Sequence, residues 1–327
     1  MSCSACGAPR RRMGRNRWLA AQPARSQRRS FSWRGGEVPE AAASSLVLLT
    51  AMLMTLHEGG QMGHDVGSFQ SMWTLVKGVP IHAMVSGNLL TLGADVLVLV
   101  HGLGLSHRYM MPVAEELARD HNVYVPDLPG FGDSGHPPRT LTIPELADGL
   151  AAWMRAAGLS RVALLGNSHG CQVIANLAVR HPRLVRCAVL QGPTTPAEER
   201  SWFRQFVRWR QNAPHNPASL DPITWGEYRR AGYWRVLRTL HYSLTDHIED
   251  HLPDIEVPVL VVRGECDPIC RADWAERLTR LLRRGRLVEI PKVAHTLVYT
   301  APAELAAATR TFLAGNLADE VRPARHR

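Results

Sequence analysis

The residues with the most evident chemistry lie in the stretch Gly-Asn-Ser-His-Gly around Ser168. The apolar run 161–166 before it predicts a buried strand, and residues 171–182 have the spacing of a helix. Ser168 is therefore expected at a sharp turn from a strand into a helix. Gly166 and Gly170 lack the β-carbons that would collide in so tight a turn. A G-x-S-x-G pattern in this context holds a serine hydroxyl above the sheet, where it can act as a nucleophile.

A serine hydroxyl with an ordinary pKa needs a general base, and the base needs an acid that orients it. Two later loops can supply both groups. Asp267 follows the predicted strand 257–263, and His295 follows the predicted strand 286–290. Glu265 lies in the same loop as Asp267 and is a second candidate for the acid. We favour Asp267, which gives the chain order serine, aspartate, histidine.

The elements that must position these residues alternate between strands and helices. Buried strands of a parallel sheet read as continuous β-branched runs, and amphipathic stretches between them predict helices. The alternation predicts an α/β fold, a mostly parallel sheet with helices on both faces. The predicted strands are 74–87 (two short strands around a Gly-Val-Pro turn), 95–102, 122–130, 161–166, 185–193, 257–264 and 286–291, and the predicted helices are 110–121, 143–158, 171–182, 271–285 and 302–317.

The chain resembles the α/β-hydrolase family over about residues 72–317. The motifs that carry the resemblance are the serine turn, "HGLG" at 101–104 and "DLPGFGDSG" at 127–135. The resemblance implies a triad of Ser168, Asp267 and His295. It also implies an oxyanion hole of backbone N–H groups, from His169 and from Leu103, with Gly104 as the near alternative. In this family the residue before the histidine is commonly glycine, whereas here it is Ala294.

The strand–helix alternation is interrupted once. Residues 196–257 read as helices without a clear strand, and their position matches the family's cap. The expected organisation is an Arg-rich tail (1–71), a core in two parts (72–195 and 258–317), the inserted cap (196–257) and a C-terminal tail (318–327). The cap holds four of the nine tryptophans: Trp202, Trp209, Trp225 and Trp234. These four are the candidate substrate-binding residues, and those that line the pocket would contact the substrate.

The charge of the chain is concentrated at its start. Residues 1–36 contain nine arginines and no Asp, Glu or Lys, and the remaining chain has 29 basic and 29 acidic residues. The body of the protein therefore gives no electrostatic reason to expect a nucleic-acid partner. Cys3 and Cys6 form a single C-x-x-C pair with no second pair nearby, so no metal site is expected.

The first 60 residues leave three interpretations open: a disordered tail, an upstream start codon chosen over a later methionine such as Met62 or Met72, and an export signal. The apolar run 45–56 is too short for a stable membrane span. With "QRRSF" at 27–31 it resembles a twin-arginine export signal, but no A-x-A cleavage site follows it. We expect a tail and a cytoplasmic protein, with export as the alternative. Nothing in the sequence predicts an oligomeric state.

These residues predict an enzyme: a serine hydrolase that acts on a small, largely apolar ester or related carbonyl compound without a cofactor. One alternative is a carbon–carbon bond hydrolase of aromatic ring-fission products, a branch of the same family whose serine turn also often reads Gly-Asn-Ser. A further alternative from another class is a hydrolase-like receptor that holds a ligand without turnover. An intact triad disfavours the receptor.

Overall fold

The computed structural model of the protein describes residues 69–87 and 95–321. The Arg-rich segment, the Cys3 and Cys6 pair and the apolar run 45–56 lie outside the described residues. Eight strands form one sheet in the order β1-β2-β4-β3-β5-β6-β7-β8. The strands are β1 (Phe69–Val76), β2 (Val79–Ser86), β3 (Val96–Val100), β4 (Asn122–Pro126), β5 (Val162–Asn167), β6 (Val185–Gln191), β7 (Val259–Gly264) and β8 (Gly285–Ile290).

The first two strands form an antiparallel hairpin at one edge of the sheet. Lys77 and Gly78 connect them, and both have a positive φ, as a two-residue turn of this kind requires. The turn therefore lies one residue earlier than the expected Gly-Val-Pro, and β1 begins at Phe69, inside the segment expected as a tail. β2 pairs antiparallel with β4, and every later pairing in the sheet is parallel. The predicted α/β fold is confirmed.

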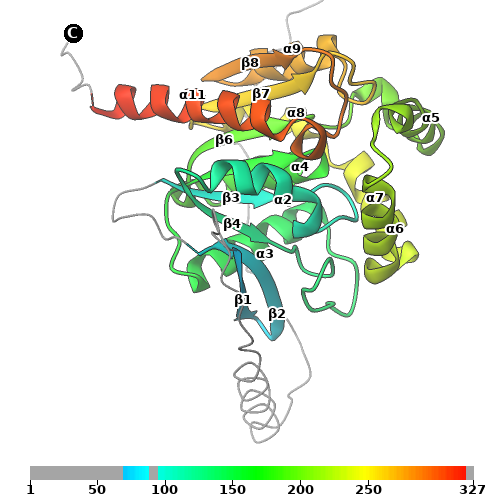
Figure 1. Ribbon diagram of the computed structural model, residues 1–327, viewed down its shortest axis with the longest axis horizontal. Coiled ribbons are helices and arrows are strands. Elements are labelled where there is room, and N and C mark those ends of the chain that lie inside the picture. The colour runs from blue at the N-terminus through cyan, green and yellow to red at the C-terminus, as the bar shows by residue number, and fades with distance from the viewer. Residues whose placement is uncertain (1–68, 88–94, 322–327) are drawn as a thin grey trace, which may run out of the picture. The chain divides into compact units, whose positions relative to one another are not determined.

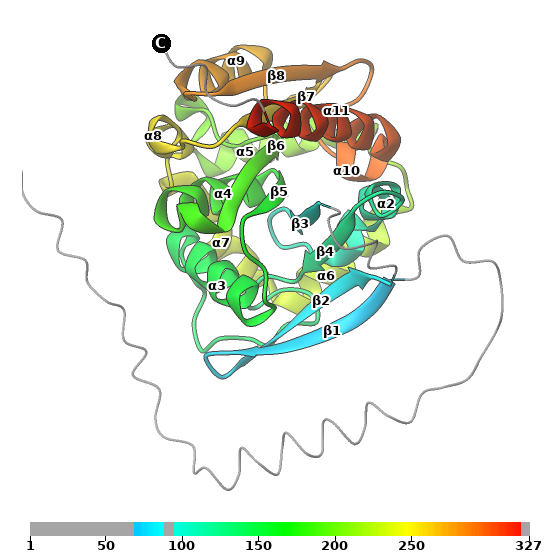
Figure 2. The same cartoon turned by 90° about the vertical axis from the view of Figure 1, so that its left-hand side faces the viewer.

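Helices cover both faces of the sheet (Figure 2). On one face Val98 and Val100 pack among side chains of α3, α4 and α9, and on the other Leu97 and Leu99 pack among those of α2 and α11. Successive residues of a strand point to opposite faces, so a continuous apolar strand fills both layers. The core helices are α2 (His107–Leu117), α3 (Ile143–Ala156), α4 (His169–Arg180), α9 (Ala272–Leu281), α10 (Leu297–Thr300) and α11 (Pro302–Val321).

Every regular element between β6 and β7 is a helix, and we call this segment the cap. Figure 1 shows α5, α6 and α7 gathered at one end of the sheet. A β-carbon on Gly104, in the loop after β3, would lie 2.7 Å from the ring of Tyr228, which places α6 over the carboxyl ends of the parallel strands. The cap elements are η2 (Ala197–Glu199), α5 (Trp202–Asn212), η3 (Ala213–His215), α6 (Leu220–Ala231), α7 (Tyr233–Thr245), α8 (Ile248–His251) and η4 (Leu252–Asp254).

A helix that crosses a membrane must be both long and apolar. Across residues 69–87 and 95–321, none of the helices combines the length and the apolar character needed to cross a bilayer.

Candidate active site

Ser168 lies at a strained turn between β5 and α4. Its φ of 54° and ψ of −115° place it in a region that L-residues rarely adopt. Strain of this kind persists only where the surrounding structure enforces it, and it is concentrated at functional sites. The backbone N–H of Ser168 donates to the carbonyl of Gln191 on the neighbouring β6, with a distance of 2.8 Å. The turn therefore presents the serine side chain at the carboxyl edge of the sheet.

The two glycines of the motif are required by close backbone approaches. A β-carbon on Gly170 would collide with the carbonyl oxygen of Val100 and would lie 2.8 Å from that of His101. A β-carbon on Gly166 would lie 2.7 Å from Ile174 and 2.9 Å from the carbonyl of Gly170. The first turn of α4 thus packs directly against the end of β3, which explains the spacing seen in the sequence.

Asp267 and His295 meet at the same edge. Asp267 lies in the loop after β7, and its Oδ2 is 2.8 Å from Nδ1 of His295, which follows β8. Oδ1 of Asp267 accepts hydrogen bonds from the backbone N–H groups of Ile269 (2.8 Å) and Cys270 (2.9 Å). Both side chains of the pair are buried. Because Nδ1 donates to the carboxylate, Nε2 of the imidazole is left as the proton acceptor.

Gln191 at the end of β6 links the serine turn to the histidine loop. Its carbonyl accepts from Ser168, and its side-chain amide donates to the carbonyl of His295 at 3.0 Å. The next residue, Gly192, packs against the imidazole, since a β-carbon there would lie 2.8 Å from Cε1 of His295. The described residues include no hydrogen bond between Ser168 Oγ and His295 Nε2. In substrate-free sites such bonds are often long and tighten only in the complex.

Glu265, the second candidate acid, is directed elsewhere. Its Oε2 accepts a hydrogen bond from the backbone N–H of Lys292 at 2.9 Å, and the residue is exposed. The structure therefore pairs His295 with Asp267, as the chain order predicts. The catalytic role of the pair stays a prediction.

Asn212 is a contact that the sequence analysis missed. It ends the cap helix α5 and is buried, and its Oδ1 accepts from the backbone N–H of His295 at 3.0 Å. The cap therefore holds the histidine loop directly. Nothing in the sequence near Asn212 signals this role, because the two residues are 83 positions apart.

The loop after β3 carries the expected oxyanion donors. A β-carbon on Gly102 would lie 2.6 Å from the side-chain oxygen of Asn167, so this loop adjoins the residue before the serine. Within residues 95–321 the N–H of Leu103 donates to no acceptor of the protein. Gly104 has a φ of 71°, a conformation that favours glycine. The structure thus brings Leu103, Gly104 and the start of α4 at His169 to one edge, and their role stays a prediction.

His101 packs beneath this loop. Its Nδ1 is 2.9 Å from the carbonyl of Gly102, and its Nε2 accepts from the backbone N–H of Leu128 at 3.0 Å. Burial lowers the pKa of His101, so the ring is neutral at neutral pH. His101 therefore ties the loop after β3 to the loop after β4.

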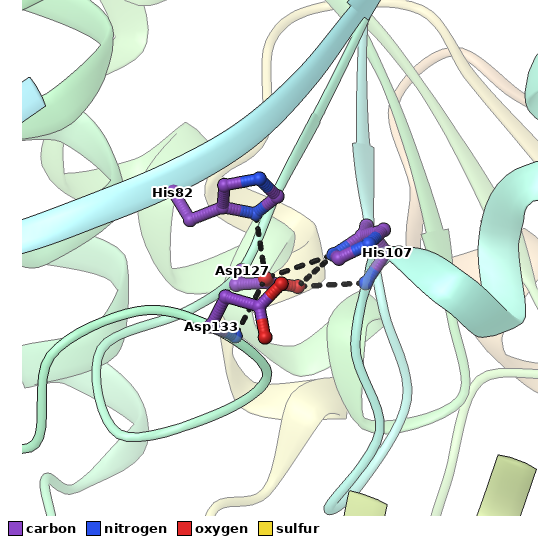
Figure 3. Close-up of side chains that lie close together, drawn as sticks. All are labelled: His82, His107, Asp127 and Asp133. Atoms are coloured by element: carbon purple, nitrogen blue, oxygen red, sulfur yellow. Dashed lines mark hydrogen bonds and ion pairs between the residues drawn. The ribbon is translucent and has the colours of Figure 1, made fainter. Parts of the chain in front are cut away.

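A buried cluster joins the same two loops at a second point (Figure 3). The carboxylate of Asp127 accepts from the backbone N–H groups of His107 (2.7 Å) and Asp133 (3.0 Å). It also lies 2.9 Å from Nδ1 of His107 and 2.9 Å from Nδ1 of His82. Burial would raise the pKa of Asp127, but the hydrogen bonds from His107 and His82 outweigh burial and hold that pKa well below its usual range.

These four residues also have the composition of a metal site. Ligand atoms of His82, His107, Asp127 and Asp133 lie within 4.8 Å of one another. The Asp127 carboxylate, however, already accepts two backbone and two imidazole hydrogen bonds, which fill its acceptor positions. The arrangement is explained as a hydrogen-bonded clamp between the loops after β3 and β4.

His169 is buried beside the nucleophile without a partner. Neither Nδ1 nor Nε2 of its ring has a hydrogen-bond partner in the described part of the chain. Burial, together with a smaller effect of the neighbouring His101, lowers the pKa of His169 to about 4. The imidazole is neutral at neutral pH, and the residue would take part in an oxyanion hole through its backbone.

The four cap tryptophans fall into two settings. Trp202 and Trp234 line a hollow of about 440 Å³ between α5 and α7. Trp209 and Trp225 contact each other edge to face, with ring centroids 6.3 Å apart. All four are exposed. The residues that line the hollow include none of the triad; they are Trp202, Trp234, Leu237, Arg238, His241 and Tyr242.

Comparisons with known proteins agree with this architecture. The model of the alpha/beta hydrolase family matches residues 97–308. An (E)-2-((N-methylformamido)methylene)succinate hydrolase of Acinetobacter baylyi is 27% identical over 67% of this chain and 90% of its own. A pimeloyl-[acyl-carrier protein] methyl ester esterase of Neisseria meningitidis is 29% identical over 67% of this chain and 93% of its own. A crystal structure of a bacterial membrane phospholipase A, 24% identical, superposes with a TM-score of 0.66 over 84% of this chain and 95% of that one.

Proposed function

Because the chain belongs to the alpha/beta hydrolase family, we propose that it is a serine hydrolase that cleaves a small, largely apolar ester through an acyl-enzyme on Ser168. The observation that carries the proposal is the buried 2.8 Å hydrogen bond between His295 Nδ1 and Asp267 Oδ2, at the edge where the strained Ser168 is presented. Nucleophile, base and orienting acid come from three separate loops that this edge brings together.

The proposed reaction has two steps. His295 Nε2 takes the proton of the Ser168 hydroxyl while Oγ attacks the ester carbonyl, and the same proton then passes to the leaving alcohol. A water molecule activated by His295 next attacks the acyl-enzyme and releases the acid. Asp267 stays ionised and stabilises the imidazolium that forms in each step.

Two backbone N–H groups are proposed to bind the oxyanion of each tetrahedral intermediate. One belongs to His169 at the start of α4, where the helix dipole adds positive potential. The other belongs to Leu103, whose N–H has no acceptor within residues 95–321. Removing one such donor typically lowers kcat by about two to three orders of magnitude.

We infer the substrate class from the side chains of the cap. The hollow between α5 and α7 is lined mainly by Trp202, Trp234, Leu237 and Tyr242, which favours an apolar acyl or aryl group. Among the relatives, the Neisseria enzyme is named as a methyl ester esterase, which supports ester hydrolysis, and the Acinetobacter enzyme is named as a hydrolase of a substituted succinate.

The proposal is tested with a panel of p-nitrophenyl esters from acetate to dodecanoate and one dienoic ring-fission product. We expect turnover of the shorter esters by the wild type and none above background by Ser168→Ala. Turnover of the dienoic compound alone would replace ester hydrolysis with carbon–carbon cleavage. Binding of esters without turnover by the wild type would make the protein a receptor and contradict the proposal.

A further inference from the structure

The cap presents an unusual amount of large apolar surface to solvent. Among the described residues, ten large apolar side chains are exposed, and eight of them lie on α5, α6 and α7. Phe203 is 75% exposed and Trp234 is 71% exposed. Scattered apolar residues are ordinary on a protein surface, but a concentration of them on a few neighbouring elements marks an interaction site. The eight are Trp202, Phe203, Phe206, Trp209, Trp225, Tyr233, Trp234 and Leu237.

Six of these side chains are linked by ring contacts, by a shared helix face or by the hollow between α5 and α7: Trp202, Phe206, Trp209, Trp225, Trp234 and Leu237. Trp202, Phe206 and Trp209 follow one another at spacings of four and three residues, so they share one face of α5. The rings of Phe206 and Trp209 are 6.4 Å apart, and Trp209 in turn contacts Trp225 on α6. The hollow joins Trp202 to Trp234 on α7. Figure 1 shows the three helices at the same end of the sheet.

The surface is also strongly basic. Residues 202–245 contain seven arginines against two acidic residues, and of these arginines Arg208 and Arg230 form ion pairs with carboxylates. Arg210, Arg229 and Arg238 are exposed, and none of them pairs with a carboxylate anywhere in the described ranges. The guanidinium of Arg238 lies 5.9 Å from the ring centroid of Trp234, so charge and aromatic surface are intermixed. We call the eight apolar residues and these three arginines the aromatic–arginine surface.

Charge decides among the partners that could cover this surface. A second copy that docked through the same face would bring the same unpaired arginines to it, and two such faces repel each other. Residues 1–36 carry nine arginines and no acidic residue, so they are repelled as well. Charge complementarity therefore favours a negatively charged partner, and this partner must also bury tryptophan and phenylalanine rings from three helices.

We propose that the aromatic–arginine surface docks on an anionic lipid membrane. Tryptophan and tyrosine favour the boundary between headgroups and acyl chains, where one part of the ring is in an apolar layer and the polar atom stays hydrated. Arginines beside them attract anionic headgroups, at about 1 kcal/mol for each basic residue near the surface. The rings of Phe203 and Trp234 enter the interface, and Arg210, Arg229 and Arg238 contact headgroup phosphates.

The test is co-sedimentation of the full chain with vesicles of phosphatidylcholine and phosphatidylglycerol in a ratio of 7:3. Two double variants separate the two components of the surface. Phe203→Ser with Trp234→Ser removes apolar area, and Arg210→Glu with Arg229→Glu reverses charge. Each double variant is expected to weaken binding at least about tenfold relative to wild type. Binding should also fall with added salt and be weak on pure phosphatidylcholine.

Matched controls lie away from the cap. Leu75→Ser removes an exposed apolar side chain from β1, and Arg183→Glu with Arg284→Glu reverses two exposed charges next to the amino ends of β6 and β8. Both controls should bind vesicles as the wild type does. Thermal unfolding of every variant checks that the fold is kept. If the apolar double variant fails to fold, the proposal is tested with the Arg210→Glu and Arg229→Glu double variant alone.

Three results would overturn the proposal. The first is equal binding by the cap variants and the wild type, which would assign membrane binding to another part of the chain such as residues 1–36. The second is no binding of the wild type to anionic vesicles. The third is a dimer in analytical ultracentrifugation that is lost in the Phe203 and Trp234 double variant without any vesicle binding. Because no substrate is used, these outcomes are independent of the proposed hydrolysis.

Discussion

Replacing Asp267 by asparagine tests the proposed triad at the position where the geometry is most informative. Two backbone N–H groups, from Ile269 and Cys270, donate to Oδ1 of Asp267. An asparagine at this position would keep its carbonyl oxygen on those donors and turn its NH2 group toward His295. Nδ1 of the imidazole would then have to accept a hydrogen bond, and its proton would move to Nε2.

The expected loss is large because the wrong tautomer cannot act as a base. With Nε2 protonated, His295 cannot take the proton of Ser168, although every other contact at the site is kept. In triads of this kind such a change lowers kcat by about 10⁴, which corresponds to about 5 kcal/mol in the activation free energy. Stability should change little, because asparagine has the size of aspartate and keeps both backbone hydrogen bonds.

The assay is steady-state hydrolysis of p-nitrophenyl butyrate, with thermal unfolding measured on the same preparations. Glu265→Gln is the matched control, since Glu265 lies in the same loop but its side chain accepts from the backbone of Lys292 and not from His295. We expect Glu265→Gln to stay within about threefold of wild type. Near-normal turnover in Asp267→Asn, or a large loss in Glu265→Gln, would refute the assignment of the acid.

Two further predictions concern buried and exposed rings near the site. With a pKa of about 4 in the folded state, His169 stays neutral where the unfolded chain is already protonated, so stability falls by about 3 kcal/mol as the pH drops from 6.5 to about 4. Urea unfolding of His169→Leu should show a smaller fall over this pH window than wild type, and an equal fall would contradict the interpretation. Among the cap residues, Trp209→Ala and Trp225→Ala should lower the melting temperature with little change in substrate ranking, because their rings pack on each other. Trp202→Ala and Trp234→Ala should shift the relative rates across acyl chain lengths, and a fixed ranking in all four variants would exclude the cap as the specificity element.

The sequence predicts the core of the fold well because buried parallel strands and amphipathic helices leave direct patterns. Helix α4 was expected over 171–182 and is observed over His169–Arg180, since the helix begins immediately after the serine turn. Helix α2 begins at His107 rather than at residue 110. The side chain of Ser106 caps it by accepting from the N–H of Arg108 at 3.2 Å. Such ends depend on capping contacts that hydrophobic periodicity does not record.

Long-range contacts at the site could not be predicted in the same way. Gln191 left a weak signal, a polar residue at the end of a buried apolar run, whereas Asn212 left none. The contact between His82 and Asp127 spans 45 residues, and only the packing of β2 beside β4 brings the two together. Pairing of this kind is a property of the sheet order, which local sequence patterns do not encode.

Covalent labelling with a fluorophosphonate tests the central claim most directly, because the reagent reacts with an activated serine and not with ordinary hydroxyls. Intact-mass spectrometry of the wild-type protein should show one adduct, and peptide mapping should place it on Ser168. The Ser168→Ala variant, with an unchanged melting temperature, should take up no label. An adduct at another serine, or equal labelling of the alanine variant, would contradict the assignment of Ser168 as the nucleophile.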